Sequence, residues 1–163
     1  MTRDGDDFLE GMHDRPGYLV RRLQQIAVAT FLHRTERAAI TPVRYAVLYA
    51  LYRQPRIDQT RLAALTALDR TSLGQVVEAL VKKKMIRRRP DPDDLRRQVW
   101  ELTPAGRRLL ERIQAPVRAS QEDLLAPLGA RERKQLLALI GKVIAGHNGL
   151  TRPSGARRFR GTA

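Results

Sequence analysis

The chain has no cysteine and only three histidines among its 163 residues. The lack of cysteine excludes disulfides, thiol redox sensing and thiolate metal sites. The three histidines (His13, His33 and His147) are not spaced with carboxylates in any metal-binding pattern, and the sequence contains no glycine-rich phosphate loop or nucleophile motif. The sequence therefore predicts a protein that is not an enzyme and that binds no metal or other cofactor.

Long apolar runs are also missing. No stretch reaches the ~18 residues that a transmembrane helix requires. The first residues are acidic and lack the apolar core of a secretion signal. We therefore expect a cytoplasmic protein with no membrane partner.

Acidic residues are few compared with basic ones, since 31 Lys and Arg face 17 Asp and Glu, for a net charge of +14. Residues 82–97 hold eight basic side chains against three aspartates, a net charge of +5. Such a concentration of positive charge is typical of a surface that binds a polyanion, most often nucleic acid. The alternative is a basic surface that serves solubility alone.

The segment from Thr71 to Gly106 is the most informative part of the sequence. An amphipathic helix is followed by a basic strand (87–89), a charged turn (90–97) and a returning strand (98–102). A helix that leads into a basic hairpin is typical of a winged helix-turn-helix. That fold places a helix in the major groove of DNA and the hairpin tip in the minor groove or on phosphates.

The remaining pattern predicts helices over residues 16–37, 42–52, 59–65, 70–83, 104–125 and 131–147. Thr41-Pro42 and Thr103-Pro104 are helix-start signals, and Asp69 is a candidate N-cap. Pro116 falls inside a helix and is expected to kink it. The predicted fold class is mainly α with a small β-wing, a winged helix-turn-helix domain with N- and C-terminal dimerisation helices.

The predicted helices at the two ends hold more apolar positions than a small monomer buries, so a homodimer with interlocked terminal helices is expected. The resulting organisation has five parts: a flexible acidic lead-in (1–15), a dimerisation helix (16–40), the winged helix-turn-helix domain (41–102), further dimerisation helices (103–148) and a basic disordered tail (149–163).

From about residue 16 to 147, the sequence resembles the MarR family of bacterial transcriptional regulators. The wing of that family reads Asp-Pro-x-Asp-x-Arg, followed by Leu-Thr-x-x-Gly. Those positions are filled here by Asp91, Pro92, Asp94, Arg96, Leu102, Thr103 and Gly106. Upstream of the wing, Leu62, Ala63 and Leu80 also stand where the family has these residues. Three positions depart from the pattern: Lys84 stands where a left-handed glycine is usual, Leu95 replaces an arginine at the wing tip, and Gly74 lies inside the recognition helix.

The recognition helix and the helix before it supply the first set of candidate DNA contacts. Arginine binds guanine and glutamine binds adenine in the major groove, while serine and threonine contact either bases or phosphate. At the start of the recognition helix, the exposed residues are Arg70, Thr71, Ser72, Gly74 and Gln75. At the start of the preceding helix, the candidate phosphate contacts are Gln59, Thr60 and Arg61.

The wing supplies the second set: Arg88, Asp94, Arg96 and Arg97. Arg96 is predicted to enter the minor groove. Asp94 is predicted either to orient Arg96 or to brace the hairpin against Arg97. Each of these residues has a simpler alternative, a solvated surface side chain.

The family resemblance implies a small effector, an aromatic acid or phenol, in a cleft between the dimerisation helices and the DNA-binding lobe. The candidate ligand-binding residues are Tyr18, Arg22, His33, Tyr45 and Tyr49. Arg22 and His33 flank an apolar helix stripe, and a cation in that position suits a carboxylate. Two alternatives stay open: the tyrosines form core, or Arg22 pairs with an acid of the partner chain.

Together these features predict a sequence-specific dimeric repressor that an aromatic ligand releases from a pseudo-palindromic operator in double-stranded DNA. One alternative is a sequence-nonspecific architectural DNA-binding protein, whose affinity is almost wholly electrostatic. Another is a regulator without a ligand, controlled by its own concentration.

Overall fold

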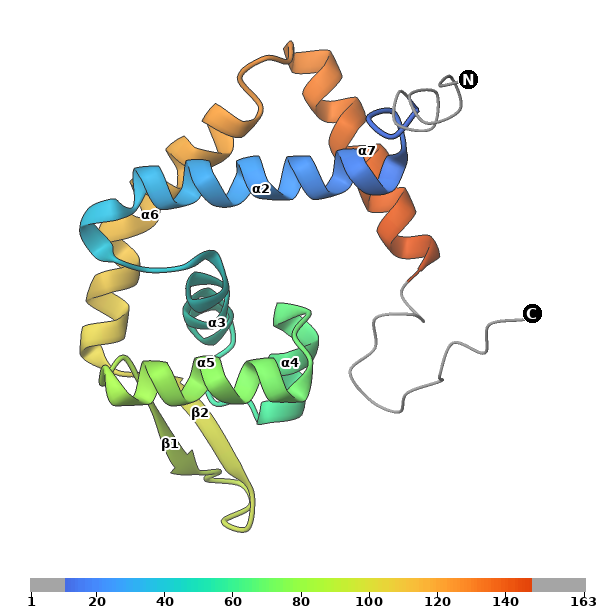
Figure 1. Cartoon of the computed structure of the whole chain (residues 1–163). Coiled ribbons are helices and arrows are strands. Elements are labelled where there is room, and N and C mark those ends of the chain that lie inside the picture. Colours follow the sequence, from blue (N-terminus) through green and yellow to red (C-terminus); the bar gives the residue numbers. More distant parts are fainter. Residues whose placement is uncertain (1–10, 148–163) are drawn as a thin grey trace, which may run out of the picture. The chain divides into compact units, whose positions relative to one another are not determined.

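The computed structural model describes residues 11–147. They form six α-helices, a short 3-10 turn and one two-stranded antiparallel sheet (Figure 1). In chain order the elements are α2 (Pro16–Arg34), η1 (Glu36–Ala38), α3 (Pro42–Arg53), α4 (Gln59–Thr66), α5 (Arg70–Lys82), β1 (Ile86–Pro90), β2 (Gln98–Leu102), α6 (Pro104–Leu124) and α7 (Ala130–Gly146). The predicted fold class, mainly α with a small β-wing, is confirmed.

Helix starts agree closely with the sequence signals, because Pro42, Arg70 and Pro104 each open a helix. The end of α2 differs: the helix stops at Arg34 rather than Arg37, and η1 follows. At that point the Thr35 hydroxyl donates to the Phe31 carbonyl at 2.8 Å, a local bond that competes with continued helix. Pro116 lies inside a continuous α6, so its kink stays a prediction. The predicted tail and most of the lead-in fall outside the described residues.

The chain divides into two compact units. Among the described residues, the first contains 11–42 together with 113–127. Its buried residues include Phe31, Ile40, Ile113 and Val117. A two-bonded ion pair joins Arg34 to Asp123, at 2.5 Å and 2.8 Å, and the hydrogen bond from Arg34 holds the pKa of the Asp123 carboxyl below its usual range.

Among the described residues, the second unit contains 43–112 and 128–147. Its buried side chains come from α3, α4, α5, both strands and the start of α6: Val47, Leu48, Leu51, Leu62, Leu73, Val77, Leu80, Ile86, Val99 and Leu110. In the sheet, Ile86 lies opposite Leu102 and Pro90 opposite Gln98. The two strands project as a hairpin beyond α5 (Figure 1).

A close junction links the end of α5 to the start of α6. Lys84 has φ 55°, the left-handed conformation for which the family usually places a glycine. The Thr103 hydroxyl donates to the Lys84 carbonyl at 2.7 Å and accepts the Gly106 N–H at 3.1 Å. A Cβ at Gly106 would lie 2.1 Å from the Met85 carbonyl oxygen, so only glycine fits there.

Large apolar side chains remain exposed on α2 and α7. Their most exposed members are Leu19, Val20, Ile26, Leu137, Leu139, Val143 and Ile144. Within residues 11–147, no helix is both long enough and apolar enough to cross a membrane.

Candidate nucleic-acid interface

Both helices of the helix-turn-helix begin at an aspartate whose side chain caps the helix. Asp58 accepts the backbone N–H of Arg61 at 2.7 Å, and this bond is the main reason that the pKa of its carboxyl is lowered. Asp69 accepts the backbone N–H of Ser72 at 2.9 Å and the Ser72 hydroxyl at 2.6 Å. The hydroxyl contributes most to the lowered pKa of Asp69. The predicted cap at Asp69 is confirmed, and the same carboxylate also accepts the hydrogen bond of the Ser72 hydroxyl.

Helix α5 separates a buried face from an exposed one. Leu73, Val77 and Leu80 are buried, as predicted. Val76, which the helical spacing of apolar residues also predicts to face inward, is only half-buried. On the opposite face Arg70, Thr71 and Gln75 are exposed. Nothing lies within 4 Å of a Cβ placed on Gly74, so a partner can approach the backbone there.

The wing sorts its arginines by strand face, since successive side chains of a strand point to opposite sides. Arg87 and Arg89 lie on one face, and their Nε atoms approach Glu101 Oε1 at 2.5 Å and 2.8 Å. Arg88 lies on the other face, with its guanidinium carbon 6.0 Å from the centre of the Trp100 ring. One face of the wing therefore holds two arginines that share a carboxylate, while the other presents an arginine over an indole.

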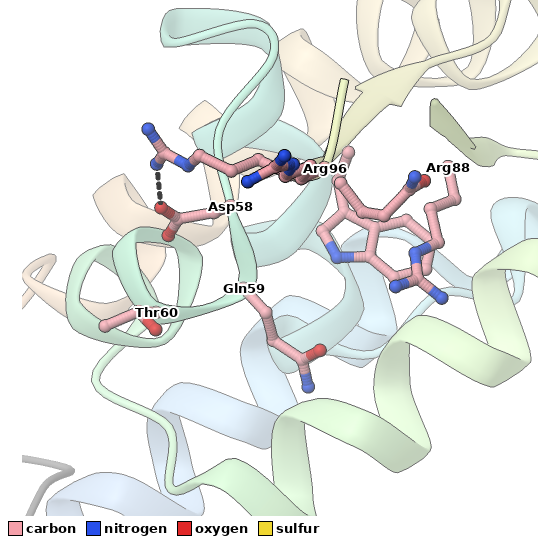
Figure 2. A pocket seen from close by; sticks show the side chains of 8 residues that line it. Asp58, Gln59, Thr60, Arg88 and Arg96 are labelled. Carbon is pink, nitrogen blue, oxygen red and sulfur yellow. Dashed lines mark hydrogen bonds and ion pairs between the residues drawn. The ribbon is translucent and has the colours of Figure 1, made fainter. Parts of the chain in front are cut away.

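The Arg88 face borders a groove between the wing and the start of α4, which we call the wing groove. Its volume is about 300 Å³ and it is lined by Asp58, Gln59, Thr60, Arg88, Arg96, Arg97, Gln98 and Trp100. Figure 2 shows these side chains, which come from both sides of the groove. Five predicted DNA contacts thus converge there: Gln59, Thr60, Arg88, Arg96 and Arg97.

Two alternative roles were predicted for Asp94, and the structure bears on the one that involves Arg97. Asp94 does not pair with the side chain of Arg97, which instead donates from Nη2 to Asp58 Oδ2 at 2.7 Å (dashed in Figure 2). Asp94 shapes the turn through the backbone, because its carboxylate accepts the Arg96 N–H at 3.0 Å and its carbonyl accepts the Arg97 N–H at 2.8 Å. The turn reverses the chain at this point, which directs the Arg97 side chain to α4.

Sequence reasoning missed three residues of the groove, Asp58, Gln98 and Trp100. The backbone N–H of Trp100 donates to the Ile57 carbonyl at 2.9 Å, so the segment before α4 pairs with the wing. The helix-start position of Asp58 was a usable signal for its cap, and the hairpin register was a usable signal for the contact between Trp100 and Arg88. Arg61 lies outside the groove, with its Nε 3.4 Å from Gln54 Oε1.

The candidate ligand residues are divided between the two units. Tyr45 and Tyr49 stack with ring centres 5.8 Å apart. They line a shallow pocket with a volume of about 340 Å³, whose other lining residues include Arg53, Gln54 and Leu65. Burial raises the pKa of the Tyr45 hydroxyl. Tyr52, about one turn further along α3, lies against Arg107 instead, and its ring centre is 5.2 Å from the Arg107 guanidinium carbon.

The other three candidates belong to α2. Tyr18 contacts the His13 ring at 4.7 Å between ring centres, and Arg22 Nη1 donates to Gln25 Oε1 at 2.9 Å. His33 is exposed. Across residues 11–147, no three His, Cys, Asp or Glu side chains gather in a way that suits a metal ion.

Sequence comparison identifies relatives of the chain. The profile of the MarR family matches residues 40–97. A Thauera aromatica protein assigned to regulation of the hcr operon is 33% identical, covering 78% of this chain and 77% of that protein. The HTH-type transcriptional repressor NicR of Pseudomonas putida is 30% identical, covering 80% of this chain and 83% of NicR. This chain belongs to the MarR family.

Solved structures agree with this assignment to the MarR family. A Pseudomonas aeruginosa protein described as a probable transcriptional regulator is 35% identical, with TM-score 0.78, over 82% of this chain and 99% of that one. The repressor CouR bound to a 23-mer DNA duplex is 28% identical, with TM-score 0.74, over 82% and 94% of the two chains. Bordetella bronchiseptica BpsR, whose DNA binding is regulated by 6-hydroxynicotinic acid, is 28% identical, with TM-score 0.77, over 81% and 94%. These relatives are described as transcriptional regulators, not as enzymes.

Proposed function

We propose that this MarR-family protein is a sequence-specific DNA-binding repressor that acts as a homodimer. One observation carries the proposal: the exposed face of α5 and the wing groove lie in the same compact unit. A recognition helix can therefore enter the major groove while the wing contacts the adjoining backbone or minor groove. The DNA-bound relative CouR supports this reading.

The residues of the interface divide by chemistry. Arg70 and Gln75 are exposed on α5 and are assigned to base edges, with Thr71, Ser72 and Gly74 beside them. Phosphate contacts are assigned to Gln59, Thr60 and Arg61 at the start of α4 and to Arg88 in the wing. Arg96, predicted to enter the minor groove, is here assigned to phosphate as well, because it lines the wing groove beside Arg88. We propose that Arg97 and Asp94 hold the wing in place rather than contact DNA, because Arg97 bonds to Asp58 and Asp94 bonds to the turn backbone.

The dimer is inferred from the exposed apolar side chains of α2 and α7. A single chain leaves Leu19 and Val20 of α2 exposed, and likewise Leu137 and Val143 of α7. Large apolar side chains that stay exposed in this number are typical of a protein interface. A two-fold dimer presents two copies of α5 to half-sites about one duplex turn apart, so the operator is expected to be a pseudo-palindrome.

The effector is proposed to be a small aromatic acid or phenol that releases the repressor from its operator. The Tyr45–Tyr49 pair offers aromatic faces beside an arginine, Arg53, and this combination suits a ring with a carboxylate. Tyr18, Arg22 and His33 are the candidates on α2. The relative BpsR responds to an aromatic acid, 6-hydroxynicotinic acid. A panel of aromatic acids is expected to contain one that raises the melting temperature, whereas a flat panel would favour a regulator without a ligand.

Selection of bound DNA from a random duplex pool tests the proposed function. A sequence-specific dimer enriches a two-fold symmetric motif with half-sites ~10 bp apart. Affinity for the enriched duplex is expected to exceed that for a scrambled one by at least ~10³-fold at physiological salt. If no motif emerges and the chain binds all duplexes equally, the repressor reading fails and the protein is an architectural DNA-binding protein.

A further inference from the structure

The arginines of the wing differ in how their charge is already compensated. Arg87 and Arg89 share the Glu101 carboxylate, whose side chain is only 18% exposed. Arg97 is paired with Asp58. In the part of the chain that the structure describes, Arg88 and Arg96 have no acidic partner within 4 Å, and both line the wing groove. The two guanidinium groups without a carboxylate partner therefore both line the wing groove, whereas Arg87 and Arg89 share one carboxylate.

Trp100 restricts the position of one of these two cations. It is the cross-strand partner of Arg88 in the sheet, and its ring centre lies 6.0 Å from the Arg88 guanidinium carbon. A guanidinium that rests on an aromatic face keeps its N–H groups free at the edge and loses less side-chain freedom on binding. Figure 2 shows Arg88 beside the indole, within the groove.

The rest of the groove suits a phosphodiester group. Gln59, Thr60 and Gln98 add neutral hydrogen-bond donors to the lining, and a volume of about 300 Å³ exceeds that of a phosphate group. The only acid in the lining is Asp58, and its carboxylate already accepts bonds from Arg97 and from the Arg61 backbone. An anion in the groove therefore meets two unpaired guanidinium groups and a carboxylate that is already neutralised.

We propose that the wing groove binds one phosphodiester of the DNA backbone, with Arg88 and Arg96 as its ligands and with Trp100 and Arg97 as positioning residues. This inference rests on the proposed DNA-binding function and deepens it. It assigns the DNA-facing side of the wing to the Arg88 face and excludes the face of Arg87 and Arg89.

Salt dependence of affinity separates the two faces. The full chain is titrated against a fluorescently labelled random-sequence duplex at several salt concentrations, as wild type and as Arg88→Gln, Arg96→Gln, Arg87→Gln and Arg89→Gln. Each phosphate contact contributes about 0.9 to the slope of log affinity against log salt. In the proposed homodimer each variant loses one contact per protomer. A fourfold rise in salt is thus expected to weaken Arg88→Gln or Arg96→Gln by about 12-fold less than the wild type, or about 3.5-fold less per lost contact.

Arg87→Gln and Arg89→Gln are matched controls for Arg88→Gln, because each removes one positive charge from β1. Their slopes are expected to stay at the wild-type value. Equal slopes for all four variants would overturn the groove assignment and leave DNA binding intact. If the wild type binds no duplex, the proposed function fails, and the groove assignment fails with it.

The role of Trp100 is tested by a double-mutant comparison. Trp100→Leu is expected to lower the salt slope, and Arg88→Gln is expected to lower it little further in the Trp100→Leu background. If Trp100→Leu only destabilised the protein, Arg88→Gln would change the salt slope as much in Trp100→Leu as in the wild type. Equal effects of Arg88→Gln in the wild type and in Trp100→Leu would therefore overturn the positioning role.

The single tryptophan also distinguishes backbone phosphate from free phosphate. Trp100 fluorescence is expected to change on addition of duplex and to stay constant with inorganic phosphate at the same ionic strength and phosphate concentration. An equal response to inorganic phosphate would replace the DNA assignment with a small-anion site.

Discussion

Replacement of Gly106 by alanine is the sharpest test of the junction between α5, the wing and α6. The added Cβ would lie 2.1 Å from the Met85 carbonyl oxygen and 3.0 Å from the Met85 carbonyl carbon, and both atoms belong to the backbone. Relief of this overlap requires the start of α6 to move away from the backbone of Met85, the residue before β1. Overpacking of this kind costs about 1–3 kcal/mol, and displacement of the Thr103 cap from the Gly106 N–H adds about 1 kcal/mol.

The expected loss for Gly106→Ala is therefore about 3 kcal/mol in the free energy of unfolding, or about 6–12 °C in melting temperature for a chain of this size. Gly74→Ala is the matched control, because nothing lies within 4 Å of the added Cβ in α5. It is expected to stabilise the protein by about 1 kcal/mol through helix propensity.

Circular dichroism melting of both variants at one fixed protein concentration gives the comparison, since dimerisation makes the melting temperature depend on concentration. The reasoning is refuted if Gly106→Ala melts at the wild-type temperature. It is also refuted if the two glycine variants shift the melting temperature in the same direction.

Three further predictions concern single side chains. Lys84→Gly is expected to raise the free energy of unfolding by about 1 kcal/mol in urea titration, because Lys84 is held at φ 55°; a drop in stability would show that the lysine side chain has a stabilising contact. Asp58→Ala is expected to lose about 1–2 kcal/mol through the α4 cap, whereas Asp58→Asn retains most of the cap; equal losses would contradict the capping role. The pKa values of Asp58 and Asp69 are lowered in the folded chain. The stability that they contribute is therefore present above their unfolded pKa of about 4 and is lost as the pH falls below that value and through the lower folded pKa. Unfolding curves measured from pH 7 downward are expected to show this acid loss, and Asp69→Asn is expected to reduce it.

Local signals carried most of the fold prediction. Proline after threonine marks the starts of α3 and α6, and Asp69 marks the start of α5, because caps and N-terminal prolines act within one helical turn. The buried face of α5 followed from helical periodicity alone. These features depend on residues close together in the chain, so the sequence shows them directly.

The ion pairs were not predictable in the same way. Asp58 and Arg97 are 39 positions apart, and Arg34 and Asp123 are 89 apart. Each of these arginines had several acids available, and only the folded chain decides between them. Sequence reasoning named Arg97 as a candidate DNA contact and as one of two possible partners of Asp94, whereas in the structure its side chain donates to Asp58.

The central claim, that the exposed face of α5 reads the DNA sequence, is tested most directly by base-pair substitutions in the selected duplex. Binding is measured for the wild type, Arg70→Ala, Gln75→Ala and the control Lys82→Ala, a lysine exposed at the other end of α5. We predict that Arg70→Ala and Gln75→Ala each lose about 1–3 kcal/mol of discrimination at one position per half-site, and that Lys82→Ala leaves discrimination unchanged at every position. Unchanged discrimination at every position in Arg70→Ala and Gln75→Ala would contradict the account.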